Sequence, residues 1–330
     1  MKTMWKQILH SIALGTVLPG MLFSSVADFG VRQTGLQEPE QSQTSPAYAE
    51  DDEVTRHFTV PVLKSDGQVE AMNLEEYIGR VVLGEMPASF EVDALKAQAV
   101  AARTYTLRCV LGGDKHPGGA VCTDYRCCQE YREPEDYIRN GGTLKNVEKV
   151  FDAVAQTAGE VLCYEGKLIL ATYFASAGGT TEDAREVWGS AVPYLTVVSS
   201  PEGDDAYNGE TVTFSADEFQ SLLGVTLKGK PENWFGRVTY TVGGGVDRMR
   251  IGGKLYDGVE LRSIFGLRST IFTVTTTDTS VTFETNGYGH RVGLSQYGAD
   301  AMAVLGSDYR EILYHYYPCT ELERYNAVTN

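Results

Sequence analysis

The sequence has few basic residues for its acidic content. Its 330 residues include 28 Lys and Arg against 44 Asp and Glu, which gives a formal net charge of −16 at neutral pH. Nucleic acids, teichoic acids and anionic lipids are bound by surfaces rich in positive charge. The composition therefore excludes a protein that holds a polyanion by bulk charge, and no nucleic-acid partner is expected.

The sequence also lacks internal repeats and a regular alternation of helical and extended segments. It is 42% hydrophobic and 22% charged, as expected of a globular protein with an apolar core. Without that alternation a doubly wound parallel sheet is disfavoured. We expect an α+β fold with mixed helices and short antiparallel β-sheets, arranged as two lobes that flank a substrate cleft.

One long stretch without charge lies near the N-terminus. Residues 8–26 contain no charged side chain and follow Lys2 and Lys6, the pattern of an export signal. We expect an extracytoplasmic protein in which residues 1–28 form a retained membrane anchor, with cleavage after Ala27 as the alternative. Residues 29–54, rich in Gln, Glu, Ser, Thr and Pro, are predicted to be a disordered linker. Residues 55–330 form the expected body, with two interleaved lobes in one folded unit.

Two helices are predicted early in the body. Asn73 is a suitable N-cap for a helix that begins at Leu74, with apolar residues recurring at helical spacing until Gly84 and Pro87 end it. A second helix is predicted from about Glu91. Glu85 therefore lies at the break between two helices.

Further along, extended segments are predicted at Glu160–Tyr164, at 172–174 and in the region 237–261. A helix is predicted at 148–157, strands at 270–276 and 280–284, and a last helix at 295–304.

Glu85 is a candidate catalytic acid. It lies between apolar neighbours in the sequence Gly84-Glu-Met-Pro87, and a partly dehydrated carboxyl group has a raised pKa suited to donating a proton near neutral pH. An ordinary acidic residue at a helix end would show the same local pattern. The residues alone leave both interpretations open.

A cluster of metal-binding side chains follows. The sequence has six cysteines, three of them between positions 122 and 128, and His116 precedes them. Thiolates and imidazole are ligands that tetrahedral zinc prefers, and four of them make a closed structural shell. We expect a structural zinc site formed by His116, Cys122, Cys127 and Cys128. Disulfide or free-thiol chemistry is the alternative, and it stays open for the other cysteines.

A glycine-rich loop at residues 287–299 is a further candidate site. Its glycines permit close backbone approach, and His290, Ser295, Gln296 and Tyr297 would lie near a helix N-terminus that can hold an oxygen-rich ligand. A tight turn between a strand and a helix would use the same glycines.

Several ordered blocks together resemble the stage II sporulation protein D family. They are the stretch from Leu74 to Tyr105 around Glu-Met-Pro, then Val187-Trp-Gly, Pro193-Tyr-Leu, Glu260-Leu-Arg, Leu267-Arg-Ser and the glycine-rich loop with Ser-Gln-Tyr-Gly-Ala. The resemblance spans about residues 58–317 in the order of the family.

The resemblance implies a peptidoglycan lytic transglycosylase. Such an enzyme cleaves the bond between N-acetylmuramic acid and N-acetylglucosamine without water and leaves an anhydro sugar, on glycan strands stripped of peptides during forespore engulfment. The resemblance implies that Glu85 is the catalytic acid of the family. Substrate-binding positions are carried over to Arg103, Ser176, His290, Ser295, Gln296 and Tyr297.

The resemblance also bears on the metal, the location and the partners. Some members of the family bind zinc through two histidines and two cysteines, and here Cys127 stands at the place of one histidine. Attachment to the mother-cell membrane and a complex with stage II sporulation proteins P and M are implied. The alternatives are a non-catalytic amidase enhancer or glycan-binding scaffold, and a zinc hydrolase, which a closed four-ligand shell disfavours.

Overall fold

The structure is a computed structural model that describes residues 58–113, 115–202 and 207–325. The expected anchor at 1–28 and linker at 29–54 lie outside the described residues. Within the described residues, no helix is both long enough and apolar enough to cross a membrane.

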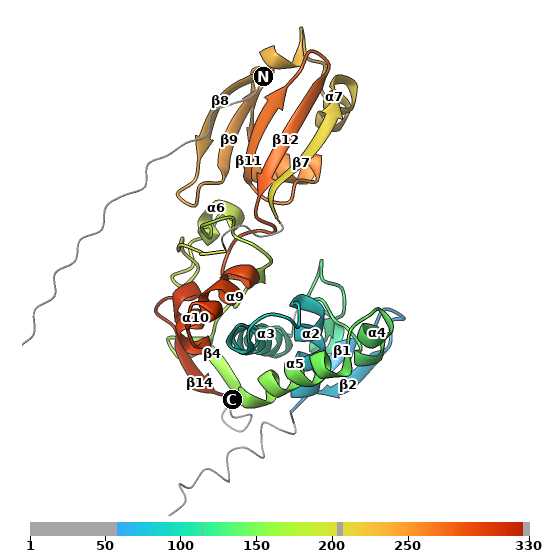
Figure 1. Cartoon of the computed structure of the whole chain (residues 1–330), viewed down its shortest axis with the longest axis vertical. Coiled ribbons are helices and arrows are strands. Elements are labelled where there is room, and N and C mark those ends of the chain that lie inside the picture. Colours follow the sequence, from blue (N-terminus) through green and yellow to red (C-terminus); the bar gives the residue numbers. More distant parts are fainter. Residues whose placement is uncertain (1–57, 114, 203–206, 326–330) are drawn as a thin grey trace, which may run out of the picture. The chain divides into compact units, whose positions relative to one another are not determined.

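A first hydrophobic core surrounds one long helix. This helix, α3 (Val92–Gly112), contains many alanines and is buried on most of its faces, since small side chains let neighbouring helices approach closely. It packs against four other helices, as Figure 1 shows for several of them. They are α2 (Leu74–Glu85), α5 (Leu144–Gln156), α9 (Gln296–Val304) and α10 (Tyr309–Tyr316).

Small sheets complete the first core. Their orders are β2-β1-β3, β14-β4-β5 and β13-β6. The pairs β1–β3 and β6–β13 are parallel and the others antiparallel. Because β14 near the C-terminus pairs with β4, both ends of the described chain contribute to one core. The strands are β1 (Thr59–Leu63), β2 (Val69–Asn73), β3 (Val121–Cys122), β4 (Glu160–Tyr164), β5 (Lys167–Leu168), β6 (Tyr173–Phe174), β13 (Leu294–Ser295) and β14 (Glu321–Arg324).

A second hydrophobic core comes from one continuous stretch of chain, residues 219–283. Phe265 stacks on Phe219 at 4.7 Å and lies 4.9 Å from Phe283, measured between ring centroids. The two sheets of this region have the orders β11-β12-β7 and β10-β9-β8, all antiparallel (Figure 1). The elements are β7 (Asn208–Ser215), α7 (Ala216–Leu223), β8 (Phe235–Tyr240), β9 (Val246–Ile251), β10 (Lys254–Asp257), α8 (Gly258–Phe265), β11 (Ile271–Thr276) and β12 (Ser280–Asn286).

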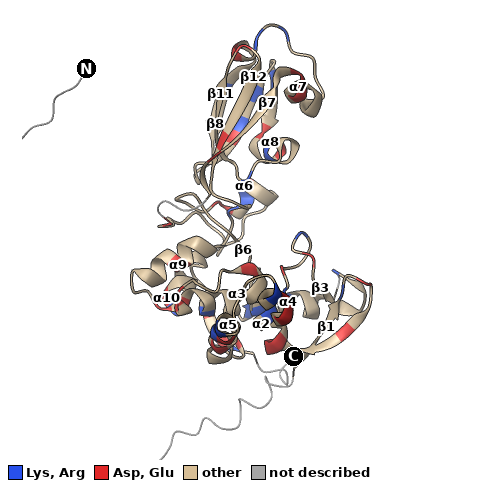
Figure 2. Ribbon diagram, turned by 45° about the vertical axis from the view of Figure 1, so that its right-hand side comes forward, with Lys and Arg blue, Asp and Glu red and all other residues tan. Residues whose placement is uncertain are grey.

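Charged side chains of both signs are interspersed along the described chain (Figure 2). Short helices carry several of them: α4 (Pro134–Arg139) and α6 (Ala184–Trp188) each hold both acidic and basic residues.

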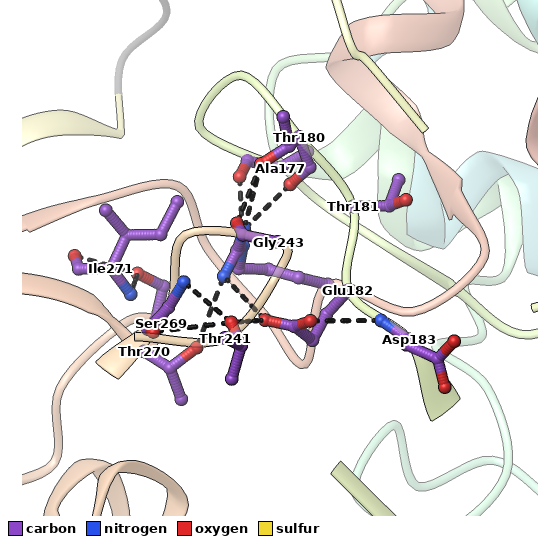
Figure 3. Close-up of polar contacts among 12 residues, drawn as sticks. Ala177, Thr180, Thr181, Glu182, Asp183, Thr241, Gly243, Ser269, Thr270 and Ile271 are labelled. Atoms are coloured by element: carbon purple, nitrogen blue, oxygen red, sulfur yellow. Dashed lines mark hydrogen bonds and ion pairs between the residues drawn. The ribbon is translucent and has the colours of Figure 1, made fainter. Parts of the chain in front are cut away.

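A buried ion pair ties segments of the two regions together. Arg291 and Glu182 are 0% and 2% exposed, and their charged atoms lie 3.6 Å apart. Arg291 also donates to the carbonyls of Ala177 and of Gly243, which belongs to the turn 241–245 between β8 and β9. Thr241 of the same turn donates its hydroxyl proton to Glu182 at 2.5 Å. Figure 3 shows Glu182 beside Thr241, and the carbonyl of Gly243 beside Thr180.

The α+β class is confirmed, and so are most of the predicted elements of the first core. Asn73 caps α2 by accepting hydrogen bonds from the N–H groups of residues 75 and 76. Helix α5 begins four residues before its predicted start at 148, because Thr143 caps it. Helix α8 lies where only strands were predicted. Its Gly258 permits this, since a Cβ there would lie 1.8 Å from the carbonyl oxygen of Val246.

Candidate active site and metal group

Glu85 is the last residue of α2. The chain leaves the helix at once, because Met86 is extended and Pro87 cannot continue the hydrogen-bond ladder. The preceding residue, Gly84, lets another segment come close: a Cβ there would lie 2.8 Å from Cγ of Glu130 and 3.1 Å from the nitrogen of Tyr131. The helix end thus brings the Glu85 carboxyl group against the segment around residue 130.

Three groups among the described residues contact the Glu85 carboxyl group. The backbone N–H of Glu130 donates to Oε1 at 2.7 Å, and the side-chain amide of Gln296 donates to Oε2 at 3.2 Å. The Tyr173 hydroxyl lies 3.3 Å from Oε1 but donates at the shorter distance of 2.8 Å to Gln129. Since Tyr173 has one proton to give, its bond to Glu85 is the weaker one, and Oε2 remains the less engaged oxygen.

The pKa of Glu85 is raised above its ordinary value. Burial is the largest cause, and it outweighs the hydrogen bonds from Glu130, Gln296 and Tyr173, which favour the anion. The position at a helix C-terminus acts in the same direction as burial, because the carbonyl end of a helix disfavours negative charge. Glu85 therefore keeps its proton to higher pH than an exposed glutamate.

Glu85 lines a cleft of about 780 Å³. The cleft walls are rich in aromatic side chains and carry the arginines Arg132 and Arg262. His290 lies between the rings of Phe174 and Trp188, 5.5 Å from each. The aromatic and cationic lining residues include Tyr105, Tyr125, Tyr173, Phe174, Tyr207, Tyr288, His290, Tyr297, Arg132 and Arg262.

His290 is uncharged at neutral pH. Burial, followed by the nearby positive charge of Arg262, lowers the pKa of His290 to about 4. Its Nδ1 accepts a hydrogen bond from the N–H of Val292 at 3.1 Å, so the ring proton sits on Nε2. The ring also forms a hydrogen bond with the backbone of Tyr173, so backbone groups hold it in place.

Four of the expected site residues line this cleft: Glu85, His290, Gln296 and Tyr297. Ser176 and Ser295 are fully buried behind it. The backbone of Ser176 pairs with Tyr288, a cleft residue, and Ser295 caps the helix that begins with Gln296. Both hold cleft residues in place from behind.

Arg103 also lies outside the cleft. It is fully buried and pairs with Glu75, whose Oε2 lies 2.6 Å from its Nη2. It further donates to the carbonyls of Val154 and Glu160. Glu75 is ten residues before Glu85 on α2, about 15 Å along the helix. Arg103 thus anchors the opposite end of the helix that carries Glu85.

His116, Cys122, Cys127 and Cys128 come together as one group. Their ligand atoms all lie within 4.8 Å of one another, and His116 Nε2 is 3.4 Å and 3.5 Å from the sulfurs of Cys127 and Cys128. Nitrogen and sulfur ligands at about 2.0 and 2.3 Å from a tetrahedral zinc would be about 3.5 Å apart. The donor set and its spacing fit a metal ion. All six cysteines are free of disulfides.

The sequence reasoning missed several cleft residues. Gln129 and the N–H of Glu130 directly follow the metal group, so its loop places them against Tyr173 and Glu85. Tyr173 was predicted only as part of an extended segment. Arg262 stands within the Glu260-Leu-Arg block but was given no role.

Comparison with known proteins places this site in a family. The protein is 38% identical over 280 residues to "Stage II sporulation protein D" of Bacillus subtilis, which covers 82% of this chain and 81% of the relative. The chain belongs to the stage II sporulation protein D family. The relative of the same name in Bacillus amyloliquefaciens is 40% identical, over 78% of this chain and 77% of its own length.

Two further matches refine this assignment. A family profile described as Stage II sporulation protein matches residues 64–164, the part that carries Glu85 and the metal group. A third relative, "Amidase enhancer" of Bacillus subtilis, is 32% identical over 74% of this chain and 40% of its own length. The family assignment therefore rests on most of the chain.

Proposed function

We propose that the protein is a lytic transglycosylase that cleaves peptidoglycan glycan strands between N-acetylmuramic acid and N-acetylglucosamine. The observation that carries the proposal is the partly buried carboxyl group of Glu85 in a cleft, with a raised pKa and with Oε2 held only by the 3.2 Å hydrogen bond from Gln296 among the described residues. Membership in a family named for stage II of sporulation supports a role in the cell wall during sporulation.

One carboxyl group suffices for this reaction. Protonated Glu85 gives its proton to the oxygen that bridges the sugars, and the bond from that oxygen to the anomeric carbon breaks. The resulting carboxylate takes the proton of the C6 hydroxyl of N-acetylmuramic acid, whose oxygen closes the anhydro ring on the same carbon. Glu85 ends protonated again and no water is consumed. A hydrolase normally needs a second carboxylate to activate water.

The neighbours of Glu85 have distinct tasks in this mechanism. The N–H of Glu130 and the amide of Gln296 fix the orientation of the carboxyl group and stabilise the transient carboxylate. The tyrosine faces of the cleft are suited to packing against sugar rings and acetamido groups. Tyr297 packs edge-on against Phe90, which holds it in the cleft wall.

The test is the product of cleavage. Purified protein and its Glu85→Gln variant are incubated with peptide-free glycan strands, and the products are analysed by mass spectrometry. We expect anhydro ends from the wild type and a loss of at least about 1,000-fold with Glu85→Gln, since this removes the only proposed proton carrier. Glu76→Gln, a half-exposed acid on the same helix, is the control. Reducing ends, one water heavier, would contradict the proposal, as would cleavage undiminished in Glu85→Gln.

A second candidate function is a non-catalytic amidase enhancer. The relative named "Amidase enhancer" favours it. In that case the purified protein would cleave nothing, while both the wild type and Glu85→Gln would bind cell-wall sacculi and stimulate an amidase equally.

We also propose that the metal group holds a structural zinc ion. His116, Cys122, Cys127 and Cys128 would supply all four ligands, which leaves no open position for substrate or water. The ion would serve to hold the loop that leads to Gln129 and Glu130. A zinc hydrolase is therefore the weaker alternative.

The cellular setting is a proposal of the same kind. We propose that residues 1–28 anchor the protein in the mother-cell membrane with residues 55–330 outside the cytoplasm, as two interleaved lobes. Stage II sporulation proteins P and M are the proposed partners, with glycan strands as substrate during engulfment. The relatives' names support the sporulation setting.

A further inference from the structure

Arg262 brings a positive charge to the cleft from the second region. It lies in the last turn of α8, and its Nε donates to the carbonyls of Leu267 and Arg268 at 3.3 and 3.2 Å. These two hydrogen bonds hold Nε of Arg262 at the end of the helix. The side chain also lines the cleft that contains Glu85.

Among the described residues, Arg262 has no carboxylate within ion-pair distance. Two other arginines, Arg132 and Arg268, each have a carboxylate within that distance. Arg132, also in the cleft, pairs with Glu130 at 3.5 Å, and Arg268 pairs with Glu210 at 2.5 Å. Because a partly dehydrated cation is costly without a counter-ion, Arg262 is the cleft residue best suited to bind an anion.

The surroundings of Arg262 are those of a sugar site. Its charge helps to lower the pKa of His290, and burial lowers the pKa of Arg262 itself. His290 is neutral and lies against Trp188, whose side chain is 43% exposed. An anion bound here would therefore sit beside aromatic faces and an uncharged imidazole ring, and would belong to a ligand with both a ring and a charge.

We propose that Arg262 binds the free lactyl carboxylate of an N-acetylmuramic acid residue from which the peptide has been removed. The inference rests on the proposed function, which brings such a glycan into the cleft. When a peptide is attached, that carboxyl group is an amide and carries no charge. Arg262 thus makes the cleft selective for peptide-free sugar, through one ion pair at the lactyl group.

The experiment measures binding apart from cleavage, in the Glu85→Gln background. Dissociation constants are determined by calorimetry for three oligosaccharides of equal length: one with free lactyl carboxylates, one with lactyl amides, and a chitin oligomer without lactyl groups. We expect the carboxylate form to bind about 10- to 100-fold more tightly than the amide form. Adding Arg262→Gln should remove this preference and leave binding of the chitin oligomer unchanged.

Two further variants separate charge from structure. Arg262→Lys keeps the charge and should retain a preference of about tenfold. Arg248→Gln, an exposed arginine of the same region paired with Asp257, should retain the whole preference.

If Glu85→Gln protein with Arg262 intact binds the carboxylate and amide forms equally well, that result alone overturns the inference. An equal loss for all three ligands in Arg262→Gln would also overturn it, because that result assigns Arg262 a purely structural role. If wild-type protein cleaves no glycan, the proposed function fails, while these binding constants still decide the role of Arg262.

Discussion

At the scale of single residues, the site depends on how Glu85 is held. Its carboxyl group combines burial, a helix C-terminus and only one short hydrogen bond, 2.7 Å from the N–H of Glu130. The first two disfavour the anion, and the third keeps the group in one orientation. A single glutamate can therefore be acid and then base in one place without a second carboxylate.

The raised pKa of Glu85 has a consequence for stability. Between its ordinary value of 4.5 and the raised value, the folded protein binds more protons at this site than the unfolded chain does. The free energy of unfolding must then fall as pH rises through this window. We expect Glu85→Gln, which has no charge to bury, to be more stable than the wild type near pH 7.5.

The expected gain is about 1.4 kcal/mol for each pH unit by which the pKa is raised. It should vanish below pH 4.5, where both states of the wild type are protonated. Urea denaturation between pH 4 and 8 measures it, with Glu76→Gln as the control. A gain that does not change with pH would contradict the raised pKa.

At the scale of elements, the metal loop and α2 form one unit. The loop leaves the metal group at Cys128, and the next two residues contact Tyr173 and Glu85. Gly84 at the end of α2 provides the space for this approach. The loop that carries the metal group thus positions the Glu85 carboxyl group through the backbone N–H of Glu130.

Loss of a metal ligand should therefore affect both stability and metal content. We expect Cys128→Ser to reduce bound zinc from about one per chain to well below one. It should lower the unfolding midpoint by about 10 °C, because each kcal/mol lost shifts the midpoint of a chain of this size by about 2–4 °C. Elemental analysis and calorimetry measure the two effects.

Cys319→Ser is the matched control, since Cys319 is exposed and lies outside the group. A chelator should reproduce the effect of Cys128→Ser in the wild type. Pure reduced protein without metal, yet with an unchanged midpoint, would contradict a structural ion.

The sequence was most informative where a pattern is local. Asn73 and Ser295 are caps whose neighbours show the helix that follows, and the close spacing of His116, Cys122, Cys127 and Cys128 indicates their chemistry. Helix α8 was missed because it has only eight residues and follows directly on strands. Arg262 was missed because nothing near it in the sequence shows which distant residues surround it.

At the scale of the whole molecule, Arg291 and Glu182 join segments that are far apart in sequence. Arg291 is buried with φ at 65°, and burial lowers its pKa to about 10, so it remains charged at neutral pH. Its contacts reach the turn between β8 and β9 and the carbonyl of Ala177 (Figure 3). The buried pair therefore fixes these segments relative to one another.

Breaking this pair on one side should be costly. We expect Glu182→Gln to lower the free energy of unfolding by about 3–5 kcal/mol, because it leaves a buried guanidinium without its counter-charge. The double variant Glu182→Gln with Arg291→Gln should lose less free energy of unfolding than the two single variants lose together. Chemical denaturation measures all three.

Arg248→Gln, which removes an exposed pair with Asp257, should cost at most about 1 kcal/mol. If Glu182→Gln loses as little free energy of unfolding as Arg248→Gln, the buried pair stabilises the fold no more than an exposed pair does.

The first and last residues of the second region lie next to each other. Asn208 at the start of β7 is the register partner of Asn286 at the end of β12, so the two ends lie about 5 Å apart. A segment with such ends can be exchanged for another one, or shortened to a brief loop, without moving the helix that carries Glu85. Arg262 belongs to this segment and would be replaced together with it. Under the proposed function, changes within residues 208–286 should therefore alter which glycan is accepted while the proton transfer at Glu85 stays the same.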